Sequence, residues 1–214
     1  MLAETNPQEV MDLSPVAHLA AIEGKVPFIN FFDGFRTSHE IQKIEKWDYA
    51  DLKEMCNMDA VKAFREHALN PEHPAMRGSH ENGDVFFQHR EACNSVYEAL
   101  PAVVKKYMGK INEKLGTNYD LFNYYGAEDA DRVIIAMGSI CDVAEEVIDY
   151  LTAKGEKVGL IKVRLYRPWV SSALLDVIPK TAKKIAVLDR TKEPGALGDP
   201  LYPVSYTHLR AHET

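Results

Sequence analysis

Residues 26–45 read VPFINFFDGFRTSHEIQKIE, and this stretch decides the fold class. Its apolar start, residues 26–32, is typical of a buried strand and stops at Asp33-Gly34. A helix is predicted to start near Ser38, because Thr37 and Glu40 have the spacing of a capping box. A strand that ends in a polar loop before a helix is how open α/β sheets hold ligand-binding groups.

This loop contains the candidate site residues, which are Asp33, Arg36, Thr37 and His39. Arg36 and His39 are needed neither for the cap nor for a core. A guanidinium beside a helix N-terminus suits an anionic 2-oxo acid or a diphosphate. The structural alternative is that Asp33 pairs with Arg36 while Thr37 caps the helix. Both interpretations stay open, and none of the four residues is assigned a catalytic role.

The first half of the chain reads as mainly helical around this strand. Asn6-Pro7 predicts a helix start, and an apolar stripe runs to Gly24, with a kink or restart expected at Pro15. The further predictions are a helix over 59–69, a loop over 70–83, an extended piece over 84–88 and helical periodicity over 90–115, interrupted near Pro101.

The second half alternates short apolar runs with helical patterns. Residues 116–129 have no clear period and are interpreted as a linker. The predicted elements that follow are strands at 132–137, 157–163 and 184–188 and helices at 140–153 and 171–177. Strands separated by helices favour a parallel sheet. The predicted fold class is therefore α/β, with two incomplete open parallel-sheet units.

Three further features have both a functional and a structural interpretation. Gly138-Ser139 could let a phosphate approach a helix N-terminus, but such pairs are common in ordinary turns, and the structural interpretation is favoured. The loop Asp189–Tyr202 could contact a domain or cofactor, or be a rigid turn-rich connection. Arg164 and Arg167 could pair with carboxylates of a neighbouring domain, or be a solvated strand end.

Composition limits the function classes. The 214 residues carry a net charge of −7 without a basic cluster, which argues against nucleic-acid binding. No apolar stretch is long enough for a membrane span, and no secretory pattern opens the chain, so the expected compartment is the cytoplasm. Cys56, Cys93 and Cys141 lack the spacing of an iron–sulfur motif and are expected to be reduced thiols. His208 and His212 could bind a metal from one helix face, but an accidental tail is favoured.

The sequence FFDGFRTSHEIQKIE resembles the pyruvate:ferredoxin (flavodoxin) oxidoreductases. The same family is resembled by PQEVMDL at 7–13, VAHLAAIEGKVPF at 16–28, DVFFQHREACN at 84–94, VGLIKVRLYRPW at 158–169 and AVLDRTKEPGALGDPLY at 186–202. The resemblance is nearly continuous from Met1 to about Tyr202. From Ser205 on, SYTHLRAHET does not resemble the family and is expected to be a non-native tail.

The resemblance implies a domain division and a partner set. Residues 1–120 would be the later part of a pyrimidine-binding domain with the thiamine-diphosphate fold, 121–130 a linker, 131–203 a truncated transketolase C-terminal-like domain II and 204–214 the tail. The enzymes it resembles oxidise pyruvate with coenzyme A to acetyl-CoA and CO2 and reduce ferredoxin or flavodoxin. Thiamine diphosphate, Mg²⁺, [4Fe-4S] clusters and a homodimer are implied for the full-length enzyme.

By order along such enzymes, the activating glutamate and the pyruvate contacts would precede Met1, and the diphosphate-binding motif and cluster cysteines would follow Tyr202. No catalytic residue is therefore carried over. The segment alone is expected to bind no cofactor, to be inactive and to aggregate through bare strand edges. The alternatives are a sister oxidoreductase for another 2-oxo acid and a non-catalytic α/β binding or assembly module.

Overall fold

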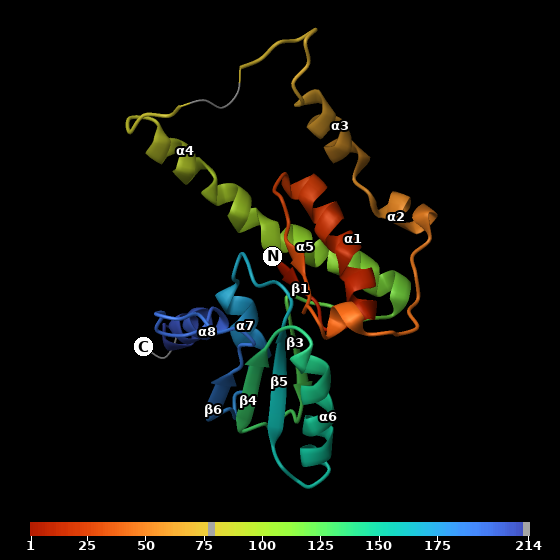
Figure 1. Ribbon diagram of the computed structural model, residues 1–214, viewed down its shortest axis with the longest axis vertical. Helices are drawn as coiled ribbons and strands as arrows, with labels where there is room; N and C mark the ends of the chain where they lie inside the picture. Colours follow the sequence, from red (N-terminus) through yellow and green to blue (C-terminus); the bar gives the residue numbers. More distant parts are fainter. Residues whose placement is uncertain (77–79, 212–214) are drawn as a thin grey trace.

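The computed structural model describes residues 1–76 and 80–211. Figure 1 shows a group of helices above a four-stranded sheet, with the N-terminus between these two parts. The molecule is α/β, as predicted, and its sheets are mostly parallel and open. No helix in the described ranges is both long and apolar enough to cross a membrane.

The four-stranded sheet is built from the second half of the chain. Its strands are β3 (Phe122–Gly126), β4 (Arg132–Ala136), β5 (Val158–Val163) and β6 (Lys184–Val187), in the spatial order β3-β5-β4-β6. Strands β4, β5 and β6 are parallel, and α6 (Ile140–Thr152) and α7 (Ser171–Val177) connect them. These five elements confirm the predicted strand–helix alternation.

β3 occupies half of the expected linker at 121–130, so this segment is part of the sheet and not only a connection. β3 is antiparallel to β5, with Phe122 opposite Val163 and Gly126 opposite Gly159. Its aromatic residues had no period that could be recognised locally. An edge strand with few side chains in the core needs no strict alternation, since one neighbouring strand supplies its hydrogen bonds.

A smaller parallel sheet contains only β1 (Leu2–Ala3) and β2 (Asn30–Phe31). The strand predicted over 26–32 is therefore much shorter than expected. β1 also joins the two halves of the chain, because the Ala3 amide donates to the Arg164 carbonyl at 2.9 Å, just beyond β5. The regular pairing of β2 ends after Phe31, where the chain turns into the loop at Asp33.

Helix α1 (Pro7–Gly24) begins as predicted, with the Asn6 side chain accepting from the Glu9 amide at 3.0 Å. The helix does not restart at Pro15, because one helix runs through this position. The hydroxyl of the preceding residue, Ser14, accepts from the Asn30 amide group at 2.8 Å. Packing against α5 compensates for the single backbone hydrogen bond that proline removes.

The helix predicted from Ser38 is absent, and only a 3-10 turn, η1 (Thr37–His39), forms there. Thr37 does not make the capping box with Glu40; its buried hydroxyl donates to the Thr5 carbonyl at 3.2 Å. Beyond η1, Gln8 exchanges two hydrogen bonds with the backbone of Glu45, at 3.1 and 2.8 Å. These long-range bonds hold residues 40–48 along α1 without helical structure.

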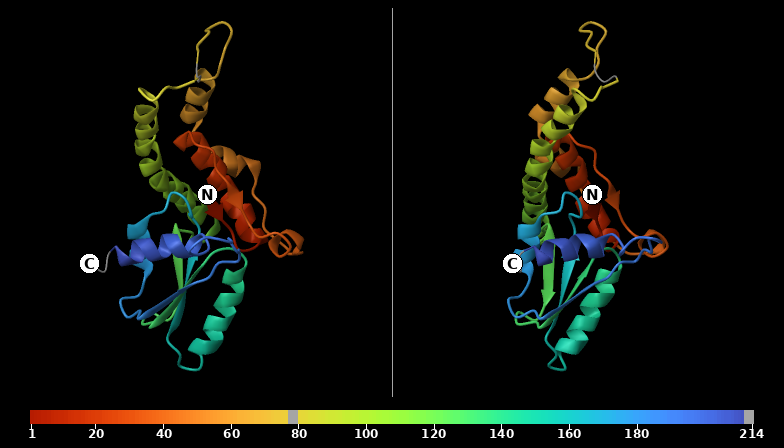
Figure 2. Two further views of the ribbon diagram at one scale, coloured as in Figure 1. Left: turned by 60° about the vertical axis from the view of Figure 1, so that its left-hand side comes forward. Right: turned by 90° about the vertical axis from the view of Figure 1, so that its left-hand side faces the viewer.

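The remaining helices of the first half are α2 (Tyr49–Met55), α3 (Met58–Glu66), α4 (Phe86–Ala92) and α5 (Asn94–Leu115). Helix α3 confirms the prediction for 59–69, whereas the extended piece at 84–88 is wrong because α4 begins at Phe86. The helical structure is interrupted at Cys93, between α4 and α5, and not near Pro101. Buried residues beyond Pro101 keep α5 packed on α1. Figures 1 and 2 show α3 and α4 projecting away from the sheet.

The core is continuous between the two halves. One cluster of buried side chains includes Leu13 of α1, Tyr107 of α5, Phe122 of β3 and Ile161 of β5. Helix α8 (Leu201–Arg210) completes this core through Leu201. Helix α8 also includes much of the expected tail, and Ser205 of this helix is buried. His212 lies outside the described residues, so the proposed histidine pair has no structural test.

Candidate functional site

The loop that follows β2 contacts the second half of the chain through Asp33. Its carboxylate Oδ2 accepts a hydrogen bond from the Ser139 amide, directly after β4. Arg190, which follows β6, places its Nη1 3.2 Å from the same oxygen and donates to the Ser139 hydroxyl at 2.9 Å. Three segments that the sequence marked separately, at 33–39, 138–139 and 189–202, therefore meet at one point.

Gly138 is required at this contact for two reasons. Its φ of +83° is a backbone conformation that side chains disfavour, and a Cβ there would lie 2.8 Å from Asp33 Oδ2. The N-terminus of α6 carries partial positive charge, which attracts an anion. Asp33 itself supplies that anion, so the structural interpretation of Gly138-Ser139 accounts for the turn.

The other loop candidates point elsewhere. Arg36 and His39 are exposed, and the ring of His39 stacks on Phe35 at a centroid distance of 5.5 Å. The Asp33–Arg36 pair of the structural alternative does not form, because Asp33 pairs with Arg190. Thr37 is buried and holds the end of the loop to Thr5.

Asp189 gives the start of the 189–202 loop a structural function. Its two carboxylate oxygens accept from the amides of Leu201 and Tyr202, each at 3.0 Å, at the start of α8. This loop, the Asp33 loop and the end of β4 line a cleft of about 290 Å³. The carboxyl ends of β2, β4 and β6 therefore surround one small hollow.

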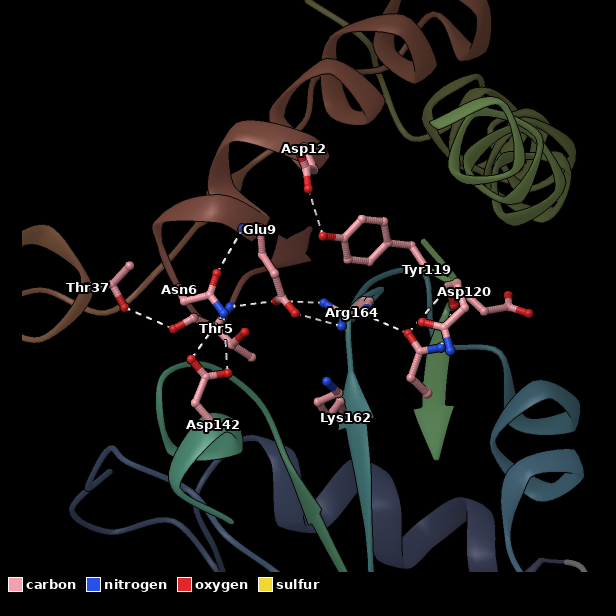
Figure 3. Close-up of polar contacts among 12 residues, drawn as sticks. Thr5, Asn6, Glu9, Asp12, Thr37, Tyr119, Asp120, Asp142, Lys162 and Arg164 are labelled. Carbon is pink, nitrogen blue, oxygen red and sulfur yellow. Dashed lines mark hydrogen bonds and ion pairs between the residues drawn. The ribbon is translucent and has the colours of Figure 1, made fainter. Parts of the chain in front are cut away.

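A buried ion pair also joins the two halves of the chain. Arg164 donates from Nη1 and Nη2 to the two carboxylate oxygens of Glu9, at 2.6 and 2.8 Å, and from Nε to Asn123 at 2.7 Å (Figure 3). Their side chains are only 4% and 9% exposed. Burial would raise the pKa of Glu9, but the hydrogen bonds and charge of Arg164 lower it below its ordinary value.

Further polar contacts connect α1 to the second half, as Figure 3 shows. Asn6 donates to both oxygens of Asp142 in α6, at 3.0 and 3.3 Å, and the Tyr119 hydroxyl donates to Asp12 at 2.9 Å. The sequence indicated that Arg164 could pair with a carboxylate from elsewhere, and Glu9 is that partner. Glu9 itself was missed as a partner, because an acid in the first turn of a helix is common on exposed surfaces.

Arg167, unlike Arg164, does not form a buried ion pair in the described part of the chain. Its guanidinium lies over the Tyr166 ring, 4.1 Å from the centroid, and donates to the Tyr166 carbonyl at 3.0 Å. Its own carbonyl accepts from the amino group of Met1 at 2.7 Å. Arg167 therefore helps to fix the start of the chain.

One candidate diphosphate site, the Gly138 turn, is closed in this structure. The glycine turn at the N-terminus of α6 is filled by the Asp33 carboxylate, and a diphosphate there would repel it. Within residues 1–76 and 80–211, no group of three or more His, Cys, Asp or Glu side chains is placed to hold a metal ion. The three cysteines are free thiols.

The fold and these contacts define the chain as an open α/β protein in which two sheets meet at a polar junction. The family model for pyruvate flavodoxin/ferredoxin oxidoreductase, thiamine diphosphate-binding, matches residues 1–109, and that for pyruvate:ferredoxin oxidoreductase core domain II matches 130–210. The chain belongs to the pyruvate flavodoxin/ferredoxin oxidoreductase family. The second match runs beyond Tyr202, where the sequence resemblance was expected to end.

Relatives match almost the whole chain but are much longer. It is 59% identical to the pyruvate-flavodoxin oxidoreductase of Enterobacter agglomerans over 94% of its length, covering 17% of that protein. It is 55% identical to the pyruvate:ferredoxin oxidoreductase of Moorella thermoacetica over 99% of its length, covering 18%. It is also similar to a solved 2-oxoglutarate:ferredoxin oxidoreductase from Magnetococcus marinus, with 26% identity, a TM-score of 0.34 and coverage of 55% of this chain and 18% of that one.

Proposed function

We propose that this chain is a segment of an enzyme that oxidatively decarboxylates pyruvate with coenzyme A. The products would be acetyl-CoA and CO2, and the electrons would pass to ferredoxin or flavodoxin. The names of the relatives support this proposal, since both curated proteins above act on pyruvate by name. The identity extends through both halves of the chain.

Within that enzyme, the segment acts as a scaffold between two domains. The observation that carries this role is the buried Glu9–Arg164 pair, because its two residues come from the two regions that different family models match. Breaking such a pair leaves an uncompensated buried charge. The proposed domains are 1–120, in the pyrimidine-binding domain, and 131–203, in domain II; the tail expected over 204–214 overlaps the family match, which extends to 210.

The cofactors of the complete enzyme are thiamine diphosphate, Mg²⁺ and [4Fe-4S] clusters. Thiamine diphosphate supplies the carbanion stabilisation that loss of CO2 from a 2-oxo acid requires. Other parts of the complete enzyme, which is several times longer than this chain, would hold these groups, and the segment alone would be inactive. The complete enzyme is a homodimer in the cytoplasm; the isolated free thiols Cys56, Cys93 and Cys141 fit a reducing compartment.

The loop containing Asp33, Arg36, Thr37 and His39 lies beside the active site of that enzyme. In the described part of the chain, Arg36 is exposed and its side chain is in no hydrogen bond or ion pair, which leaves the guanidinium available for an anionic 2-oxo acid. Its neighbour His39 is also exposed, stacked on Phe35.

The experiment is an assay of pyruvate-dependent viologen reduction by the complete enzyme with Arg36→Ala. Loss of a charged hydrogen bond to substrate is expected to lower kcat/KM for pyruvate by roughly tenfold or more. The matched control is Arg65→Ala on the projecting helix α3, which should keep the original rate. An undiminished rate with Arg36→Ala would remove the loop from the active site. Faster turnover of another 2-oxo acid than of pyruvate would contradict the proposed substrate.

A further inference from the structure

We propose that Asp33 is the anchor that positions the 33–39 loop, and that Arg190 and the N-terminus of α6 are its receptor. The anchor is a property of the folded chain. Its consequence for turnover rests on the proposed function, in which this loop borders the active site.

The contacts form a closed arrangement of three groups. Asp33 Oδ2 accepts from the Ser139 amide, Arg190 Nη1 lies 3.2 Å from Oδ2, and the same Nη1 donates to the Ser139 hydroxyl at 2.9 Å. The Asp33 side chain is only 22% exposed, whereas that of Arg190 is 51% exposed. The carboxylate is therefore shielded by the receptor, and its charge-assisted hydrogen bond is of the stronger kind.

The receptor fits the Asp33 carboxylate in both charge and shape. Helix α6 has 13 residues, so its N-terminus offers a well-developed partial positive charge. Gly138 leaves the space that Asp33 fills, because a Cβ at Gly138 would lie 2.8 Å from Asp33 Oδ2. Both the charge and the shape of this turn thus select Asp33.

The loop depends on its two ends for its conformation. Phe35 has a left-handed φ of 62°, which is costly for an aromatic residue, and the residue is 87% exposed. Inside the loop, the Ser38 amide reaches the Asp33 carbonyl at a long 3.3 Å. Thr37 secures the far end through Thr5, and Asp33 secures the near end. The Arg36 amide also donates to the Gly34 carbonyl at 2.7 Å across Phe35, but this bond lies within the loop. Of these contacts, those of Asp33 and Thr37 are the ones that tie the loop to other segments.

Arg36 provides a direct readout, because trypsin cleaves after arginine and this residue lies between the two attachment points. In the 214-residue chain, Asp33→Ala and Arg190→Gln should each raise the rate of cleavage after Arg36 by about tenfold, as local opening becomes easier. Cleavage products would be assigned by mass spectrometry, and Arg36→Gln would verify the site. The matched control is Asp129→Ala, which breaks the exposed pair with Lys157 at the amino ends of β4 and β5.

Two further variants test the geometry. Asp33→Asn keeps an oxygen for the Ser139 amide but loses the charge, so its cleavage rate should lie between those of the original chain and Asp33→Ala. Gly138→Ala should release the loop as Asp33→Ala does. The double variant should be cleaved no faster than either single variant, since both changes remove the same contact. If Asp33→Asn and Arg190→Gln retain the original cleavage rate and thermal midpoint, the anchor is refuted.

In the complete oxidoreductase, displacement of the loop should raise KM for pyruvate about tenfold while kcat changes less than about twofold. Arg190→Lys, which keeps the cation, should have a KM close to that of the original enzyme, whereas Arg190→Gln should show the raised KM. If Arg36→Ala has no effect on activity but Asp33→Ala frees the loop, the proposed active-site location fails and the anchor stands. If Arg36→Ala impairs activity but Asp33→Ala leaves cleavage unchanged, the anchor fails and the proposed function stands.

Discussion

Glu4 shows how strongly the position of one residue can change its chemistry. Its carboxyl group is fully buried, and neither oxygen has a hydrogen-bond partner in the described part of the chain. Burial and the nearby Glu9 carboxylate raise the pKa of Glu4 to about 9, although Arg164 opposes this shift. Glu4 is therefore protonated at neutral pH, directly beside the ionised Glu9–Arg164 pair.

We expect Glu4→Gln to remove a pH-dependent loss of stability. The unfolded chain releases the Glu4 proton above its ordinary pKa of 4.5, whereas the folded chain holds it to about 9. Stability present below pH 4.5 is thus lost as pH rises toward 9, with a limiting slope of about 1.4 kcal/mol per pH unit. The amide cannot ionise, so the stability of the variant relative to the original chain should increase as the pH rises through this range.

The measurement is the free energy of unfolding from urea titrations at several pH values between 5 and 9. Glu66→Gln, at an exposed position of α3, is the control and should follow the original curve. A constant difference between Glu4→Gln and the original chain across this range would show that the Glu4 carboxyl is not perturbed.

Helix α1 shows that element ends are set by more than the nearest glycine. The sequence predicts that Gly24 closes α1, but the helix includes Gly24, and Lys25 takes the left-handed cap conformation with a φ of 55°. Gly24 instead lies where α1 approaches α5, and a Cβ there would come within 2.5 Å of a Leu100 methyl. Gly24 is therefore needed for the close packing of α1 on α5, and the left-handed cap conformation falls on Lys25.

Lys25→Gly should stabilise the protein, because glycine adopts a left-handed cap without the steric cost that lysine has there. The expected gain is up to about 1 kcal/mol in the free energy of unfolding. Lys43→Gly, in the exposed irregular segment 40–48, is the control and should give no gain. Thermal and urea unfolding of both variants would check this, and a loss of stability with Lys25→Gly would show that the cap is not strained.

On the scale of the whole molecule, two family-matched regions share one hydrophobic core. Leu2 and Leu13 from the first region pack in the same cluster as Val133 and Leu174 from the second. Backbone bonds from β1 to the segment after β5 and the Glu9–Arg164 pair add to this junction. The two regions should therefore unfold together, although each corresponds to a separate family model.

The two tryptophans allow a direct test of cooperative unfolding. Trp47 lies in the first region and Trp169 in the second. Both indole N–H groups are buried and have no partner among the described residues, so replacement by Phe loses no hydrogen bond there. Each variant keeps one tryptophan, so its fluorescence reports the unfolding of one region, and circular dichroism reports the whole chain. In each variant the urea midpoints from the two signals should coincide. Two separated midpoints would show that the junction does not couple the regions.

Local pattern was enough for elements whose side chains repeat with a clear period. Helix α6 and strands β4, β5 and β6 match their predicted positions closely, because burial on one face imposes that period on the sequence. The prediction failed for residues 38–48 and for β3. In those segments, hydrogen bonds from distant residues, such as Gln8 to Glu45 and β5 to β3, replace local preference.

The amino-acid sequence alone determined the α/β class, the family and the loop to inspect, because residue pattern and motif wording are local properties. Asp33 was recognised within that loop, but the one partner considered for it was Arg36, as an alternative left open. Only the tertiary structure brings Arg190 and the α6 N-terminus to Asp33, and it buries Glu4 and Glu9 beside Arg164. Ion-pair partners and burial depend on which distant segments meet in space, and no local period encodes that.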